Sequence, residues 1–398
     1  MQRFIWIILM ISILAGGCAG RDYAKVLTIK APNFDLVDVP VYIDIETESL
    51  KGALGVCLTS KGMVIPAQVE ERSAEVSRIW WVLNLKAGET KNYGLLLNKE
   101  CKTEIYTWRR VSPESVRLYF GEQPVISYEH PVFDPDDIEY TKKPYHHVYD
   151  PTSDMLITKG VGGLFSHHRG IFFGYNHVDF NGHRVDIWHA HQGERSEHEA
   201  FIREFTGPVY GGHILKIPWK DRAGNIILEE VREIRVFRQD AGQTLIDFQS
   251  TLSAPAGPVK LDGDLQHAGV QFRAAQYVAD NASATLFIRP EAWSHIEPAS
   301  ELRGDDLSNL PWNAMHFSIK DKPFTVAYLS HQDNSEITEM SERQYGRFGE
   351  FFPAMVTDGN PLKVHYRFWI LAGKKPGIED IELRYNALRS NPEIIIKK

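Results

Sequence analysis

The sequence predicts an all-β protein, in which a small N-terminal β-sandwich is followed by a large antiparallel β-sandwich and a short C-terminal helix. Short apolar runs rich in β-branched and aromatic residues recur along almost the whole chain, and turn residues separate them. A helical spacing of apolar residues is sustained only near the C-terminus. The chain has 398 residues, enough for two domains, and its 43% hydrophobic and 24% charged residues are typical of globular proteins.

Residues 1–17 are a targeting segment. Arg3 precedes an apolar run over residues 4–14 that is too short to span a bilayer. Residues 14–18, Leu-Ala-Gly-Gly-Cys, resemble a bacterial lipoprotein cleavage site, although Ala15 stands at the usual leucine position. We therefore expect cleavage before Cys18, lipid attachment there, and an outer-membrane or periplasmic location in which the lipid is the only contact with the membrane. An ordinary secretory signal is the alternative.

After such processing, two cysteines remain unmodified, Cys57 and Cys101. An exported chain can pair them, but the sequence leaves open whether they meet. A cysteine-based zinc site is excluded by the count.

Residues 24–100 form the predicted small sandwich. Its β-type runs are residues 39–45, 79–85 and 91–97, and a turn at residues 87–90 precedes the last of them. No catalytic combination of side chains lies in this segment, so we expect it to support or dock the rest of the chain.

The predicted large sandwich covers residues 103–376. Strand-like runs lie at residues 105–111, 115–120, 125–128, 226–237, 245–252, 324–329 and 364–371. A long series of strands with few helices predicts large stacked sheets.

The C-terminal segment, residues 377–398, begins with a helix over 377–389, because Ile378, Ile381, Tyr385 and Leu388 form an apolar stripe.

Composition also excludes some functions. The net charge is −8 and no stripe of Lys and Arg occurs, which argues against a nucleic-acid partner. The sequence contains neither a glycine-rich phosphate loop nor a Gly-x-Ser-x-Gly elbow, so nothing indicates a nucleotide cofactor or a serine nucleophile of that kind.

Histidines concentrate in one part of the chain. Of 16 histidines, eight lie between residues 167 and 213: His167, His168, His177, His183, His189, His191, His198 and His213. Imidazole gains or loses a proton near neutral pH and is the commonest metal ligand. Mixed with Arg169, Asp186 and Trp188, the cluster indicates a polar pocket with aromatic walls. A set of half-exposed strand histidines is the alternative.

A metal site is one interpretation of this region. If residues 184–191 form a strand, His189 and His191 share a face at a spacing that lets both bind one ion. Calcium or zinc would need further ligands, for which His213 and Glu230 are guesses. A second histidine pair, His146 and His147, lies in a turn-rich stretch that we expect to reach the same pocket as a loop.

Two further polar clusters follow. Asp262-Gly263-Asp264 is a turn signal, and after it His267, Gly269, Gln271 and Arg273 would line one face of a strand. Tyr345 lies between Arg343 and Arg347, an arrangement that suits an anion because arginine binds carboxylates in bidentate geometry. His331 follows a strand end, where loop residues often carry function.

Several motifs resemble the bacterial family often labelled PmoA-like, or methane oxygenase-like. They are Lys-Pro-Tyr-His-His-Val-Tyr-Asp-Pro at 143–151, His-His-Arg-Gly-Ile-Phe-Phe-Gly at 167–174, Val-Asp-Ile-Trp at 185–188, residues 264–273, and Tyr-Gly-Arg-Phe-Gly-Glu-Phe-Phe at 345–352. The resemblance covers most of residues 25–372. One departure is that Phe165-Ser166 stand where the family usually has His-Pro, which removes a ligand that such a histidine would carry.

The resemblance implies an exported, largely β protein similar to the galactose-mutarotase-like supersandwiches of many polysaccharide lyases and sugar mutarotases. A membrane monooxygenase subunit would need several spanning helices, and no segment after the signal is long and apolar enough. Fold analogy suggests a function without establishing it.

These observations favour an enzyme that acts on carbohydrate, most concretely a lyase on uronic-acid-containing glycans. His168 or His267 would be the base, Arg169, Arg273 or Arg347 would hold the carboxylate, Tyr345 would donate the proton, and Trp188 and Phe173 would stack on sugar rings. The catalytic candidates are His167, His168, Arg169, His267, Arg273 and Tyr345, and the substrate-binding candidates are His146, Phe173, Asp186, Trp188, Gln271, His331, Arg343 and Arg347. A hydrolase, a non-catalytic glycan-binding lipoprotein and a metal-dependent oxidase are the alternatives.

Overall fold

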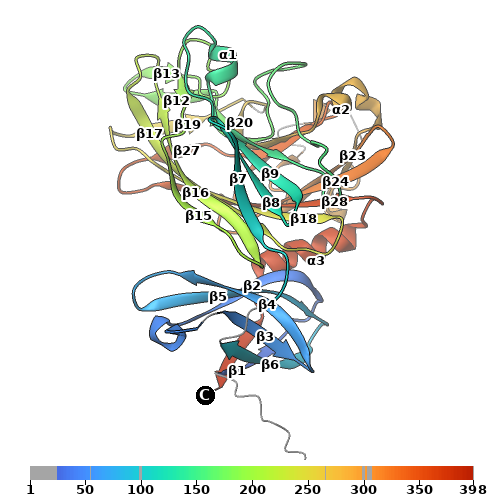
Figure 1. The fold of residues 1–398 in the computed structure, drawn as a ribbon. Helices are drawn as coiled ribbons and strands as arrows, with labels where there is room; N and C mark the ends of the chain where they lie inside the picture. Colours follow the sequence, from blue (N-terminus) through green and yellow to red (C-terminus); the bar gives the residue numbers. More distant parts are fainter. Residues whose placement is uncertain are drawn as a thin grey trace, which may run out of the picture.

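A computed structural model describes residues 25–397 except 54, 98–100, 265, 298–300 and 303–306. The predicted signal and Cys18 lie outside this part of the chain. As predicted, the described residues form mostly antiparallel β-sheets with a short C-terminal helix (Figure 1). Among the helices described, none is long and apolar enough to cross a bilayer.

The small N-terminal unit is a seven-stranded antiparallel arrangement in the order β2-β5-β4-β3-β6-β1-β29. Its strands are β1 (Lys25–Lys30), β2 (Leu36–Glu46), β3 (Val56–Ser60), β4 (Met63–Glu71), β5 (Val76–Leu85), β6 (Thr90–Leu97) and β29 (Glu393–Lys397), with the 3₁₀ turn η1 (Thr47–Leu50) after β2. Trp81, Leu58 and Leu95 belong to a core of its own. Cys57 and Cys101 form a disulfide, with Cα atoms 6.1 Å apart.

The large unit contains two extensive sheets and a smaller one. The first sheet has the order β22-β25-β26-β20-β11-β10-β9-β8-β7, the second runs β14-β16-β17-β18-β28-β24-β23-β21 with β15 paired to β16, and the small sheet is β13-β12-β19-β27. Short helices α1 (Ile138–Thr141) and α2 (Gln276–Asp280) and the turns η2 (Ala282–Ala284) and η3 (Glu291–Trp293) lie in the connections.

The bounds of the first sheet's strands are β7 (Tyr106–Ser112), β8 (Ser115–Phe120), β9 (Gln123–Glu129), β10 (Tyr145–Val148), β11 (Ile171–Tyr175), β20 (Ala268–Arg273), β22 (Glu301–Leu302), β25 (Glu339–Arg343) and β26 (Arg347–Phe351). The second sheet contains β14 (Arg195–Ser196), β15 (Ala200–Phe205), β16 (Tyr210–Lys220), β17 (Ile226–Phe237), β18 (Gln243–Ser253), β21 (Leu286–Ile288), β23 (Trp312–Ile319), β24 (Lys322–Ser330) and β28 (Leu362–Ala372). The third contains β12 (His177–Phe180), β13 (His183–Val185), β19 (Val259–Asp262) and β27 (Ala354–Val356).

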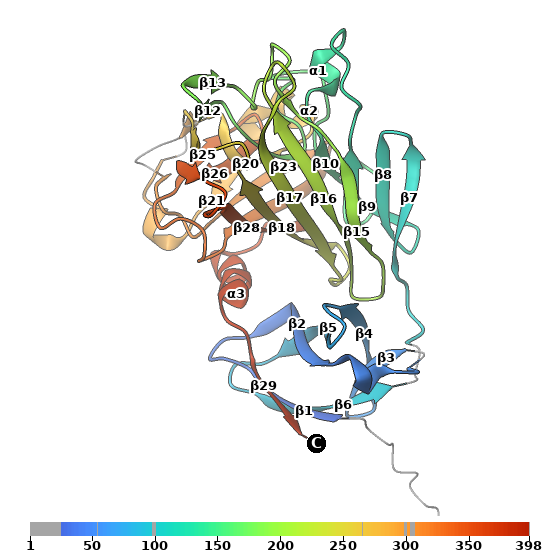
Figure 2. The same ribbon diagram turned by 90° about the vertical axis from the view of Figure 1, so that its left-hand side faces the viewer.

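The two extensive sheets pack face to face, and their inward side chains make one hydrophobic core (Figure 2). Phe173 of β11 lies 5.4 Å from Trp219 of β16 and 6.2 Å from Phe248 of β18, measured between ring centroids. Strand residues alternate between faces, so Phe173 points into the sandwich while its neighbour Phe172 points outward. The outer face of β11 is therefore available to carry a site.

The C-terminal helix was predicted from its apolar stripe and is confirmed as α3 (Ile378–Arg389). It contacts β2 of the small unit and β24 of the large one, and Figure 1 shows it between the two. Buried Arg384 joins the units by donating to the Val37 carbonyl and to Gln239 Oε1. Beyond α3, the chain returns to the small unit as β29, which pairs with β1.

Two local predictions were wrong. Residues 184–191 are not one strand, because β13 ends at Val185 and the chain then turns. Asp186 causes the turn: its Oδ1 accepts from the His189 amide at 2.7 Å, and its carbonyl accepts from the Ala190 amide at 3.0 Å. The pair His146-His147 is not in a loop either, since both residues lie in β10.

Candidate functional site

The candidate site lies over the outer face of β11. Phe172 packs there with Trp188 and Tyr145 in a small buried aromatic cluster, separate from the sandwich core. The neighbouring strands place Gln271 of β20 opposite Phe172, and Arg273 opposite Arg347 of β26. This face of the sheet is thus aromatic on β11 and polar on β20 and β26, and loops cover it.

The segment before β11 approaches the sheet closely at Gly170. Its φ is +45°, and a Cβ there would lie 2.0 Å from the His146 carbonyl oxygen. Only glycine fits such an approach. The Gly170 amide donates to the Lys159 carbonyl and its carbonyl accepts from the Arg273 amide, both at 2.8 Å. Gly170 therefore fixes the base of the preceding loop, residues 160–168, which is called the histidine loop below.

Four segments that are distant in sequence meet at this place. His167 and His168 come from the histidine loop, His189 from the turn after β13, His267 from the turn before β20, and Tyr345 from the turn between β25 and β26. The ring of His168 lies 6.0 Å from that of His267 and 6.2 Å from that of Tyr345. The three polar clusters expected from the sequence therefore share one site.

Three of these histidines form a tighter group. His167, His189 and His267 are half-buried, and each offers a ligand atom within 4.8 Å of those of the other two. The ring of His189 lies 4.7 Å from that of His167 and 4.5 Å from that of His267. These three residues are called the histidine trio below.

Carboxylates hold two rings of the trio. Asp186 Oδ2 lies 2.8 Å from His189 Nδ1, and both oxygens of Asp264 lie within 2.9 Å of His267 Nδ1. Burial opposes ionisation of Asp186 and Asp264, but hydrogen bonds from these histidines outweigh it and lower the pKa of both carboxyls. An ionised carboxylate accepts only, so Nδ1 of each ring carries a hydrogen, and in the neutral form of the ring Nε2 presents a lone pair.

Buried cations hold the backbone of the histidine loop. Lys159 Nζ donates to the carbonyls of Gly160, Phe165 and His168 at 3.2–3.3 Å. Arg169 Nε donates to the Ser166 carbonyl at 3.1 Å, and Arg273 reaches the Leu164 carbonyl.

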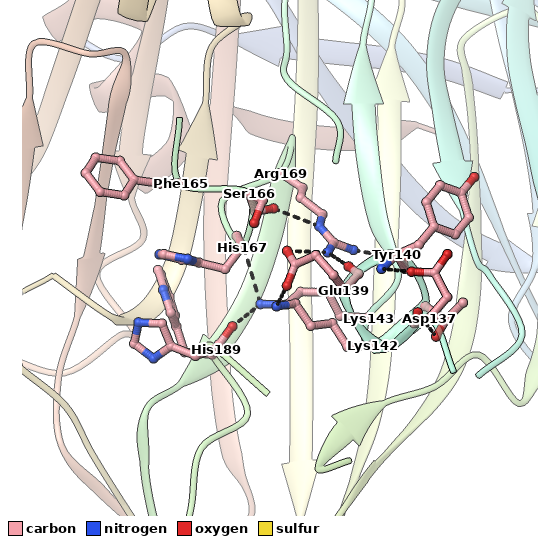
Figure 3. Close-up of polar contacts among 12 residues, drawn as sticks. Asp137, Glu139, Tyr140, Lys142, Lys143, Phe165, Ser166, His167, Arg169 and His189 are labelled. Carbon is pink, nitrogen blue, oxygen red and sulfur yellow. Dashed lines mark hydrogen bonds and ion pairs between the residues drawn. The ribbon is translucent and has the colours of Figure 1, made fainter. Parts of the chain in front are cut away.

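Lys143 holds two segments of the site at once. Its ammonium group lies between the carbonyls of His167 and Trp188, and Figure 3 shows it beside the rings of His167 and His189. The loop and the turn that carry these two histidines are thus tied to one buried side chain. Nearby, Glu139 pairs with both Lys142 and Arg169 (Figure 3).

Burial shifts the protonation of several groups here. It lowers the pKa of Lys143 well below its usual range, and Lys142 and Arg169 add repulsion. Burial also lowers the pKa of Lys159 to about 7 and that of Arg273 to about 10. The pKa of His167 is strongly lowered by burial and by nearby Lys143, so its imidazole is neutral at physiological pH.

Several predicted catalytic roles do not fit the structure. His168 is 2% exposed, and both of its ring nitrogens are enclosed, so a substrate does not reach it as a base. Arg169, Arg273 and Arg347 are fully buried. The first two donate to loop carbonyls, and Arg347 donates to Gln271, Ser341 and the Tyr345 hydroxyl, so none of them faces a substrate carboxylate.

The substrate-binding candidates also divide. Asp186 is at the site and orients His189, Trp188 is buried beneath the cluster, and Gln271 binds Arg347. Phe173 lies in the sandwich core and cannot stack on a sugar. Arg343 is buried in β25 and donates to the Glu342 carbonyl.

Two more candidates lie apart from the cluster. His146 is buried against His213, with Nε2 atoms 2.8 Å apart, and stacks on Tyr128. His331 stacks on His365 and lines a separate polar cavity of about 270 Å³ with Asp247 and Arg367.

The predicted metal pair is also corrected. His191 is exposed and lies outside the trio, although its ring is 5.6 Å from that of His189. The guessed further ligands are used elsewhere: His213 pairs with His146, and Glu230 binds Trp219 and Arg232.

Three contributors were missed from the sequence. Lys143 begins one of the motifs that carry the family resemblance but was given no role, and Lys159 had no sequence signal beyond its charge. Phe165 is 43% exposed, and its ring lies 5.0 Å from Tyr345. Its φ of +52° is unusual for a bulky residue, and such strain gathers at functional sites. Phe165 is therefore the exposed aromatic surface that was expected from Phe173.

The candidate site lies within the part of the chain that matches a known protein family. A family model described as "Family of unknown function (DUF6807)" matches residues 115–384, about two thirds of the chain, and this range includes every residue of the cluster. No curated protein matches the chain. The resemblance to PmoA-like proteins stays a prediction.

Proposed function

The chain belongs to the DUF6807 family, whose function is unknown, and we propose that it is an exported carbohydrate-active enzyme, most concretely a polysaccharide lyase on uronic-acid-containing glycans. One observation carries the proposal: four distant segments bring His167, His189, His267 and Tyr345 together on a partly exposed face. Groups able to accept and donate protons, gathered beside an exposed aromatic ring, suit acid–base chemistry on a sugar.

The reaction is an elimination. A base takes the proton from the ring carbon next to the carboxylate, and the electrons of that C–H bond form a C=C bond. The C–O bond to the neighbouring sugar breaks, and the leaving oxygen takes up a proton. A positive group near the carboxylate stabilises the negative charge that develops there.

Tyr345 is the group that we assign to proton transfer. It is half-buried, and Arg347 Nε donates to its hydroxyl oxygen at 3.1 Å, which fixes the direction of the phenol. One tyrosine serves as both base and acid if it starts as the phenolate. It takes the proton from the ring carbon and passes that same proton to the leaving oxygen, which lies on the same side of the sugar ring. This assignment replaces His168 as the base, because His168 is enclosed.

The histidine trio marks the part of the site that we assign to the substrate carboxylate. Its rings present lone pairs, so the positive charge that the carboxylate needs would come from a group bound to them. The three arginines first considered for that role are buried and bonded to protein atoms. His167, His189 and His267 are partly exposed at the same place. Phe165, exposed beside Tyr345, supplies an aromatic face on which a sugar ring can stack.

The Cys57–Cys101 disulfide supports export, because disulfides persist in oxidising compartments and are rare in the cytosol. The apolar run at residues 4–14 and the lipoprotein-like residues 14–18 point the same way. An anchored enzyme at the cell envelope meets polymers too large to enter the cell.

The test is incubation with a panel of uronate polymers while ultraviolet absorbance of the new C=C bond is recorded. Wild type should give a rising signal, and Tyr345→Phe should remove it. His331→Gln is the matched control, because His331 lies in a separate cavity and its loss should leave the rate unchanged.

Two other outcomes would contradict lyase chemistry. Release of reducing ends without new absorbance would identify a hydrolase that uses the same site. Retention of glycan by wild type without any turnover would identify a binding lipoprotein.

A further inference from the structure

The histidine trio has a feature that proton transfer does not require. A single base needs one lone pair, whereas His167, His189 and His267 bring three ligand atoms within 4.8 Å of one another. They come from three separate turns, so their convergence is a product of the fold. In a tetrahedral zinc site, ligand nitrogens lie roughly 3.3 Å apart, given Zn–N bonds of about 2.0–2.1 Å. The ligand atoms of the trio lie within 4.8 Å of one another, so they would have to approach by up to about 1.5 Å to reach that spacing.

Each ring is also arranged as a ligand. His189 and His267 bond a carboxylate through Nδ1 at 2.8 Å, which leaves Nε2 free. Metal-binding histidines usually donate their other nitrogen to a carboxylate or carbonyl in this way. His167 Nε2 is buried and, among the residues that the structure describes, has no hydrogen-bond partner. A buried polar atom without a partner is costly and calls for a ligand.

We propose that His167, His189 and His267 bind one divalent transition-metal ion, with Asp186 and Asp264 orienting two of the three ligands. Three imidazoles suit zinc and its neighbours in the first transition row, whereas calcium prefers oxygen ligands. Three protein ligands also leave a coordination position open, which is the arrangement of catalytic rather than structural zinc sites.

Charges of both signs surround the trio: Lys143 Nζ lies against the His167 carbonyl, and two carboxylates lie against the other two rings. Asp186 and Asp264 together supply two negative charges directly behind the ligands. Such outer-shell carboxylates raise the basicity of the histidines and offset the charge of the ion.

The role of this ion in catalysis rests on the proposed function, whereas its binding does not. Tyr345 belongs to the same site, because the ring of His168 lies 6.2 Å from that of Tyr345 and 6.0 Å from that of His267. An ion held by the trio would supply, to a uronate carboxylate, the positive charge that the buried arginines do not.

The test uses the purified exported protein, stripped of metal with a chelator and titrated with zinc ion in a calorimeter. Cobalt(II) in place of zinc gives a visible absorption band that reports coordination by nitrogen. Wild type should bind one ion per chain and bind zinc more tightly than calcium. Asp264→Asn should weaken zinc binding roughly 10–100-fold, as the loss of an outer-shell partner does. His189→Gln and His267→Gln should weaken it further and remove the cobalt band.

His191→Gln is the matched control, since His191 neighbours His189 but lies outside the trio. It should bind zinc like wild type. Circular dichroism of each variant separates lost ligands from lost fold. Absence of saturable zinc binding in wild type, tighter binding of calcium than of zinc, or unchanged zinc affinity in both His189→Gln and His267→Gln would overturn the proposal. The titration contains no glycan, so its failure is distinct from failure of the lyase assay.

Discussion

Replacing Glu350 by glutamine tests how much free energy of unfolding the protein loses when a buried carboxyl group ionises. Glu350 lies in β26 and is 1% exposed, and Ser330 Oγ donates to its Oε1 at 2.8 Å. Burial raises the pKa of this carboxyl from 4.5 to about 7, and hydrogen bonds from Ser330, Tyr366 and Thr338 only partly oppose the shift. The folded chain therefore holds a proton on Glu350 in a pH range where the unfolded chain has lost it.

The sign and size of the effect follow from that difference. Between about pH 4.5 and 7 the folded state binds the additional proton, so the stability contributed by Glu350 falls as the pH rises through this window. A shift of about 2.5 pKa units corresponds to about 3 kcal/mol. Glutamine resembles the neutral acid, so Glu350→Gln should be more stable than wild type by up to about 3 kcal/mol at pH 8, with little difference near pH 4.5.

The assay is urea unfolding followed by tryptophan fluorescence at several pH values from 4.5 to 8. Only the difference between variant and wild type is used, because the buried histidines add their own pH dependence to both. Asp247→Asn is the matched control with the opposite sign. Arg367 outweighs burial and lowers the pKa of Asp247, so this variant should lose about 3–5 kcal/mol at pH 8. A Glu350→Gln difference that stays constant with pH would refute the reasoning.

Three further predictions concern the fold and the site. Replacing Cys57 and Cys101 by serine should lower the free energy of unfolding by about 4 kcal/mol, because the disulfide closes a loop with a sequence separation of 44; urea unfolding measures this. Phe173→Ala should cost about 3–5 kcal/mol in the same assay, as expected for a ring in the core rather than one at a sugar site. Lys143→Met should raise the free energy of unfolding at pH 7, because burial lowers the pKa of Lys143 and so disfavours folding of the protonated chain. This gain should shrink as the pH rises toward 10.5, where the lysine of the unfolded chain also loses its proton. The same variant should weaken zinc binding roughly 10–100-fold, because it frees the His167 and Trp188 carbonyls; unchanged zinc affinity would show that Lys143 does not position the trio.

The sequence predicted the fold well, because strands and helices leave periodic apolar patterns. The strand predicted at 226–237 matches β17 (Ile226–Phe237), and α3 begins one residue after its predicted start. The failures occurred where local chemistry overrode the pattern. Residues 184–191 alternate like a strand, but Asp186 accepts hydrogen bonds from the amides of His189 and Ala190, three and four residues ahead, so the chain turns.

The candidate site was only partly predictable. Sequence clustering identified His167, His168, His267 and Tyr345, and in the structure the ring of His168 lies within 6.2 Å of the rings of the other three. It could not show which nitrogen of each ring is free, because that depends on contacts such as the one between Asp264 and His267. It also favoured neighbours in sequence over neighbours in space, so His191 was chosen as the partner of His189 where the fold supplies His267.

The distribution of charge at the site argues for a division of labour between cations and imidazoles. Every strongly basic side chain first considered for substrate binding is buried, and Arg169, Arg273, Lys143 and Lys159 donate instead to carbonyls of the histidine loop and its neighbours. Burying a cation costs several kcal/mol, so their presence implies that a fixed loop conformation matters. The loop held in this way places His167, a half-buried imidazole whose Nε2 is enclosed, beside His189 and His267. Three imidazole nitrogens converge beside cations that are already bonded to loop carbonyls, and this arrangement suits the metal ion proposed above. An anionic substrate would then bind to the protein through that ion.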